Sequence, residues 1–86
     1  SAHASYAEWA RTKAMVLGSS QQYTDLLSWI DTPLGAKLAP EARQELLAMK
    51  ALAQLGVKDQ KGYEASLKAA LDILPGSELA KKLRDN

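Results

Sequence analysis

Few residues of this chain are suited to acid–base or nucleophilic chemistry. The sequence has one histidine, His3, close to its first residue, and no cysteine. A serine nucleophile needs a neighbouring base, and His3 lies where chain ends are usually poorly ordered. Asp25 and Asp31 are six residues apart, a spacing that does not place both on one helix face. We therefore expect no catalytic site and no enzyme activity.

Metal and cofactor sites are equally unsupported. Without cysteine, neither a thiolate metal site nor a disulfide framework can form. The acidic residues do not have the spacing of a calcium loop, and the chain has no glycine-rich phosphate loop. We expect no bound metal and no cofactor, and the composition leaves the cellular compartment open.

The charge balance argues against nucleic acid and membrane partners. Eleven basic and ten acidic residues give a formal net charge of +1, whereas a phosphate-binding surface needs a basic excess. In the segment that could serve as a recognition helix, Lys68 is balanced by Glu64 and Asp72. No apolar run approaches the ~18 residues of a membrane span. We expect neither nucleic acid binding nor membrane insertion.

Basic and aromatic side chains are better suited to recognising another protein. Three polar residues share a narrow strip on the otherwise apolar segment 40–56, and a lysine in the first segment is their nearest counterpart. Such a strip suits an acidic or carboxylate-ended peptide, and exposed tryptophans are typical interface anchors. Solubilising lysines and tryptophans that complete a small core remain the alternative. The candidate partner-binding residues are Trp9, Lys13, Trp29, Arg43, Leu47, Lys50 and Gln54.

The composition predicts the elements that must position these residues. Alanine (15 residues) and leucine (14) dominate, isoleucine and valine together supply four, and phenylalanine is absent. Straight-chain and small residues favour helices, whereas β-branched and aromatic residues favour strands. We expect a single all-α domain over residues 1–86. Its predicted parts are a helical hairpin at 5–31, a connector at 32–39, a second hairpin at 40–74 and a capping helix at 77–85.

Local signals place the helix boundaries. Gly18 is suited to the left-handed conformation that ends a helix. Ser19 and Gln22 have the spacing of a capping box, which would start the second helix. A proline at the first helical position or a capping side chain starts each later helix, at Pro40, Asp59 and Ser77.

Helical periodicity predicts which faces are buried. The segment 40–56 is apolar almost all round, so neighbours should pack against several of its sides. The other segments have single stripes. They are Tyr6, Ala10, Ala14 and Leu17 in the first, Tyr23, Leu26, Leu27 and Ile30 in the second, and Tyr63, Leu67, Ala70, Leu71 and Leu74 in the fourth.

The two halves of the chain repeat in outline. "KAMVLG" at 13–18 is followed by Tyr23, an apolar helix and Pro33, and "KALAQLG" at 50–56 by Tyr63, an apolar helix and Pro75. The Leu-Gly pairs are 38 residues apart, which is in the range of helical repeats that stack to bury their apolar faces.

This pattern resembles a tetratricopeptide repeat, most closely in "LAQLG…GYEASLKAALDILPGS". The resemblance implies antiparallel helix pairs in a right-handed superhelix, with a concave surface that binds peptides or helices. Tyr63 lies about one turn too close to Ala70 and Leu71, and the earlier alanine of the family is out of register. The repeat is thus degenerate, and a small helical bundle is the alternative.

The functional expectation follows from these points. We expect a non-catalytic module that binds another protein in its groove, as an adaptor, scaffold or chaperone-like domain. The alternative is a structural domain that self-associates or docks within its own parent protein. Because the chain begins "SAHAS", we expect a fragment or a processed form whose first residues are not native.

Overall fold

The described part of the chain folds into five α-helices. A computed structural model describes residues 3–35 and 37–85, and no strand occurs among them. The all-α prediction is therefore confirmed. The helices are α1 (His3–Ser19), α2 (Tyr23–Leu34), α3 (Pro40–Gly56), α4 (Gln60–Ile73) and α5 (Glu78–Asp85).

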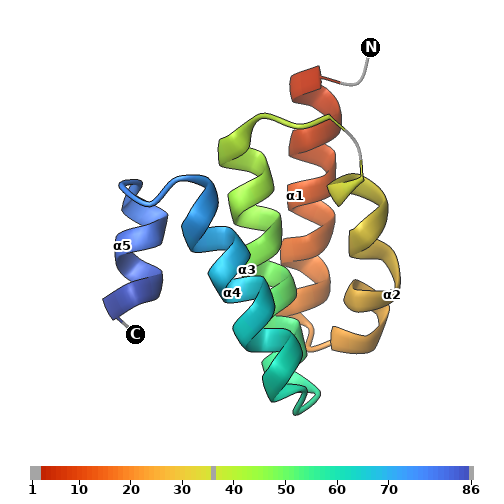
Figure 1. The fold of residues 1–86 in the computed structure, drawn as a ribbon. Coiled ribbons are helices and arrows are strands. Elements are labelled where there is room, and N and C mark those ends of the chain that lie inside the picture. Colours follow the sequence, from red (N-terminus) through yellow and green to blue (C-terminus); the bar gives the residue numbers. More distant parts are fainter. Residues whose placement is uncertain (1–2, 36, 86) are drawn as a thin grey trace.

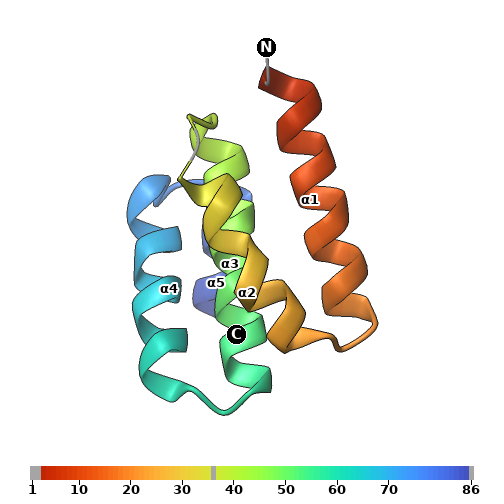
Figure 2. The ribbon, with the colours of Figure 1, turned by 90° about the vertical axis from the view of Figure 1, so that its right-hand side faces the viewer.

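α1 and α2 form one hairpin, and α3 and α4 form the second (Figure 1). α3 is the central helix of the molecule. A short turn at 20–22 joins α1 to α2, and another at 57–59 joins α3 to α4. Figure 2 shows α1 and α4 on opposite sides, with α2 and α3 between them. α3 packs against each of the other four helices. This central place explains why its sequence is apolar on nearly every side, as predicted.

The main core between α1, α2 and α3 combines alanines with larger aliphatic side chains. Its buried members are Ala10, Ala14, Leu26, Ile30, Leu46 and Ala53. The distance between packed helices depends on the side chains at their contact, so alanines allow a close approach. The predicted stripes of the first two segments are thereby confirmed, with their remaining members half-buried.

α4 buries less of its predicted stripe. Only Ser66 and Ala70 are buried on this helix, whereas Tyr63 and Leu67 are half-buried. The Ser66 hydroxyl donates a hydrogen bond to Gln54 Oε1 at 2.6 Å, which satisfies both polar groups between α3 and α4. The stripe predicted for α4 had not included this serine.

The turn between α1 and α2 differs from its prediction. Gly18 and Ser19 are both helical, and the left-handed residue is Gln21, with φ at 60°. Gln22 precedes α2 and makes no side-chain cap, so the predicted capping box is wrong. Its amide instead donates to Ser20 Oγ at 2.7 Å. The helix continues through Gly18 because glycine permits a left-handed turn without requiring one.

The end of α2 also lies beyond its predicted position. Pro33 belongs to the last turn of α2, where it is buried, so the connector starts at Gly35 rather than at residue 32. The backbone N–H of Gly35 donates to Asp31 O at 3.0 Å and carries the helical pattern past the proline. A proline this close to a helix end removes one hydrogen bond without breaking the helix.

The later helices begin as predicted. Pro40 is the first residue of α3. Asp59 Oδ1 accepts a hydrogen bond from the Gly62 N–H at 3.0 Å, and Ser77 Oγ accepts one from the Ala80 N–H at 3.0 Å. These side chains satisfy N–H groups that have no partner within the helix.

Candidate protein-binding groove

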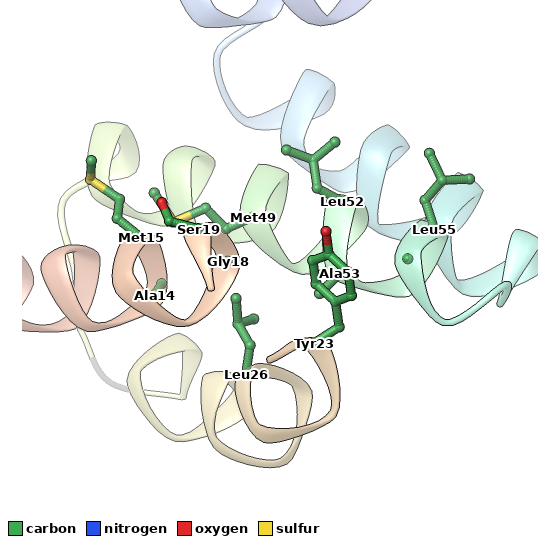
Figure 3. A pocket seen from close by; sticks show the side chains of 11 residues that line it. Ala14, Met15, Gly18, Ser19, Tyr23, Leu26, Met49, Leu52, Ala53 and Leu55 are labelled. Atoms are coloured by element: carbon green, nitrogen blue, oxygen red, sulfur yellow. The ribbon is translucent and has the colours of Figure 1, made fainter. Parts of the chain in front are cut away.

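A groove opens between the C-terminal halves of α1 and α3 (Figure 3). Its volume is about 510 Å³, and the start of α2 forms part of its floor. The groove residues are Ala14, Met15, Gly18, Ser19, Tyr23, Leu26, Met49, Leu52, Ala53, Leu55 and Gly56.

Small side chains and one aromatic ring form the floor of the groove. Ala14 and Ala53 are fully buried there, and Gly18 adds no side chain. The Tyr23 ring packs directly on Gly56, where an added Cβ would lie only 2.5 Å from a ring carbon. The small residues leave space at the floor, and the close Tyr23–Gly56 contact ties the start of α2 to the end of α3.

Large apolar side chains stand exposed on the rim of the groove. The exposed fraction is 55% for Met15 on α1, and 57% for Leu52 and 45% for Leu55 on α3. Val16 and Val57, next to groove residues in the chain, are also exposed. Single exposed apolar residues are ordinary, but a contiguous set around a concavity indicates an interaction surface.

The groove is uncharged along its length. The segments 14–24 and 51–57, which supply most of its lining, contain no charged residue. One turn before Met15 and Met49, Arg11 Nε lies 3.1 Å from Glu45 Oε2 and joins α1 to α3. Beyond Gly56, the first charged residue is Lys58. None of the residues that line the groove is charged, and Lys50, which lies within the α3 wall, pairs with Asp31 on α2.

The residues of the predicted polar strip on α3 contact two different helices, α2 and α4. Arg43 Nη1 donates to the Leu34 carbonyl at 2.7 Å, and Lys50 Nζ lies 2.8 Å from Asp31 Oδ1. Both contacts tie α3 to α2, whereas Gln54 faces Ser66 on α4. A charge reversal at Arg43 or Lys50 would therefore disturb the packing of α2 on α3 as well as any ligand.

The predicted residues of the first hairpin form a separate cluster on α1 and α2. Lys13 Nζ lies 4.5 Å from the Trp29 ring centre and 5.4 Å from that of Trp9. The two indoles meet edge to face, with centres 5.6 Å apart. Trp9 is 51% exposed, while Trp29 is half-buried against the core. This aromatic cluster does not include Leu47, which is half-buried on α3.

The exposed apolar rim was not among the predicted partner-binding residues. Leu52 and Leu55 belong to the segment 40–56, whose apolar sides we expected neighbouring helices to cover, and Met15 was assigned to no predicted face. Two uncharged segments, 14–24 and 51–57, lie near the same positions of the two sequence repeats. The lack of charge at matching positions of the two repeats was the sequence feature that could have indicated the groove.

Other kinds of site find little support in the described residues. The side chain of His3 lies outside them, and within them no group of three or more histidines and acidic residues is placed to hold a metal ion. On α4, the hydrogen bond and the charge of Asp72 raise the pKa of Lys68, so this cation is already paired. None of the described helices has both the length and the hydropathy that a bilayer crossing requires.

Comparison with known proteins assigns the chain to no family. No protein-family model, no curated protein and no solved structure matches it. The functional argument therefore depends on the groove and the surfaces around it.

Proposed function

We propose that this domain is a non-catalytic protein-interaction module that binds the apolar face of a partner helix in the groove between α1 and α3. The observation that carries the proposal is the exposure of Met15, Leu52 and Leu55 around a floor of small residues. Helix-in-groove recognition joins such a surface to an apolar stripe on the ligand. Burial of these three side chains would supply the main stabilising contribution to binding.

The dimensions of the groove suit a short helical segment. From Met49 to Gly56 the α3 wall contains eight residues and spans about 10 Å, or two helical turns. A partner helix would present two or three large apolar side chains over that length, at i, i+3 or i+4, and i+7. The small residues Ala14 and Gly18 at the floor leave room for those side chains.

A tetratricopeptide-like architecture accompanies this function in our proposal. The first helices of the two hairpins, α1 and α3, both line the groove, as the concave surface implied by the sequence resemblance would require. Further support comes from the 38-residue spacing of the Leu-Gly pairs, and α5 would cap the open side of the second hairpin.

A capture experiment with matched variants tests the proposed function. The immobilised domain is compared with Leu52→Glu, which puts a charge on the groove rim. The control is Ala65→Glu, which puts the same charge on the exposed face of α4. Both sites are exposed, so neither variant should unfold. We expect a partner that the original domain and Ala65→Glu retain and Leu52→Glu loses. Equal retention by all three would contradict the groove assignment.

Self-association is the second candidate function. Val16 and Val57 extend the exposed apolar surface beyond the groove, and a twofold dimer would bring such a patch against its own copy. Sedimentation equilibrium distinguishes the two candidates. Self-association would be favoured over a partner helix if the mass of the original domain rises to that of a dimer as its concentration increases, while Leu52→Glu keeps the mass of a monomer.

A further inference from the structure

We infer that α5 is a detachable cap, which leaves α3 and α4 while the other four helices stay folded, and that the hydrogen bond from Ser77 to Gln44 is its latch. This inference goes beyond the proposed function, because α5 supplies none of the residues that line the groove. It depends on how little of α5 is attached to the rest of the molecule.

The contact between α5 and its neighbours is small. Of the other described helices, α5 packs against α3 and α4 alone, and Figure 1 shows it at the edge of the molecule, on the side away from α2. Within Glu78–Asp85, Ala80 is the one buried residue, while Leu79 and Leu83 are half-buried. Elements that bury few apolar side chains open locally at a lower cost than the core. Since eight residues are too few for a stable isolated helix, α5 should unfold as it leaves.

The charged side chains of α5 do not tie it to the rest of the domain. Lys81 Nζ lies 3.9 Å from Glu78 Oε1 on the same helix, and Arg84 Nη1 donates to the Pro75 carbonyl at 2.8 Å. Both contacts lie within the segment 75–85. They therefore do not hold α5 against α3 or α4.

A single hydroxyl fastens α5 to α3. Within the described part of the chain, the one side-chain hydrogen bond or ion pair from α5 and its cap to α3 or α4 joins Ser77 Oγ to Gln44 Oε1, at 2.6 Å. The same Ser77 oxygen accepts the Ala80 N–H and so starts the helix. The Gln44 amide nitrogen is held by the carbonyls of Ala70 and Leu74, which fixes the direction of its oxygen even without α5. Release of α5 therefore uncovers this oxygen and the side of α3 around it.

The hinge that this motion needs lies between α4 and α5. Residues 74–77 are not helical, and Pro75 and Gly76 are exposed. A Cβ atom on Gly76 would meet nothing within 4 Å, so no packed side chain opposes a rotation there. α5 can therefore swing away without disturbing the packing of α3 on α4.

Amide hydrogen exchange of the full chain tests whether α5 opens alone. We expect the amides of residues 81–84 to be protected at least about 100-fold less than those in the middle of α3, because α3 exchanges only when the whole domain unfolds. The substitution Ile30→Val, in the core between α1, α2 and α3, should speed exchange in α3 about two- to tenfold and leave α5 unchanged. Equal acceleration in both helices would show that α5 opens only with the whole domain and would overturn the inference.

Substitutions of Ser77 test the latch. Ser77→Asp keeps an oxygen that can cap the Ala80 N–H, but its carboxylate cannot donate to Gln44 Oε1. We expect exchange at residues 81–84 to become about two- to tenfold faster. Ser77→Thr keeps the hydroxyl, so its exchange should stay within about twofold of the original domain. Unchanged exchange in Ser77→Asp would overturn the latch, and none of these variants alters a residue that lines the groove.

Discussion

The side-chain amide of Gln44 joins three parts of the molecule. It is only 1% exposed, and its Nε2 donates to the carbonyl oxygens of Ala70 at 2.7 Å and Leu74 at 3.1 Å. Its Oε1 accepts a hydrogen bond from the Ser77 hydroxyl at 2.6 Å, and Ser77 in turn caps α5. This single residue therefore connects α3 to the end of α4 and the start of α5.

Replacement of this amide tests its contribution to stability. Gln44→Met keeps the length of the side chain but leaves two buried carbonyl groups and one hydroxyl without this partner. We expect a loss of about 1–3 kcal/mol in the free energy of unfolding, measured by urea denaturation. The control is Gln60→Met, at an exposed glutamine on α4, which should change stability by less than about 0.5 kcal/mol. Similar losses in both variants would show that the Gln44 network does not stabilise the fold.

The role of Gln44 could not be predicted from its residue type. Glutamine is mostly exposed in proteins, and the polar strip predicted on this helix included Arg43, Lys50 and Gln54 instead. Position 44 faces α4 and the start of α5, and only the packing of those elements reveals which carbonyl groups need a donor. The sequence did indicate that α3 is surrounded, but not which polar residue it would bury.

At the scale of the helices, two glycines in similar sequence contexts differ in how much space surrounds their Cα atoms. Gly18 and Gly56 both follow a leucine near the end of the first helix of a hairpin. A Cβ on Gly18 would meet Leu26 at 3.8 Å, an ordinary contact, whereas on Gly56 it would meet the Tyr23 ring at 2.5 Å. The repeat in the sequence is therefore not matched by equivalent packing.

This difference predicts opposite effects of one substitution. Gly18→Ala should raise the free energy of unfolding by about 0.5–1 kcal/mol, because alanine loses less backbone entropy in a helix. Gly56→Ala should lower it by about 1–3 kcal/mol, because the Tyr23 ring must move to admit the methyl group. Thermal unfolding of the two variants side by side measures both signs. A stabilised Gly56→Ala would contradict the close Tyr23–Gly56 contact.

Helix starts were easier to predict than helix ends. Pro40, Asp59 and Ser77 act within one turn of their own position, so their residue types were sufficient. The ends near Gly18 and Pro33 depend on whether tertiary packing favours another turn, and in both places α1 and α2 continue. A glycine or a proline marks where a helix can end, and the surrounding core decides whether it does.

At the scale of the whole molecule, the groove arises from the pairing of two distant segments. Residues 14–19 of α1 and 49–56 of α3 become its two walls, and the start of α2 closes the floor between them. The all-α fold followed from the composition, and the stripes of α1 and α2 followed from helical periodicity. The groove did not, because the gap between α1 and α3 depends on the small side chains at their contact and on the Tyr23 ring.

The limits of helical periodicity also explain why the predicted partner-binding residues are spread over the molecule. Lys13 and the two tryptophans gather at one place on α1 and α2, while Arg43 and Lys50 pack against α2 from the other side. Helical periodicity places residues on a face of one helix but does not say which neighbour that face meets. The partner-binding role of these residues stays a prediction, and the groove provides the sharper hypothesis.

Backbone amide chemical shifts measured during a ligand titration test the central claim most directly. The ¹⁵N-labelled domain is titrated with a helical peptide selected from a library for binding to it, and with the same peptide after its apolar stripe is changed to serine. We expect the largest shifts at Met15, Gly18, Leu52 and Leu55, little change in α5, and no response to the serine peptide. Shifts centred on Trp9, Lys13 and Trp29, or on α4 and α5, would show that the groove between α1 and α3 is not the binding site.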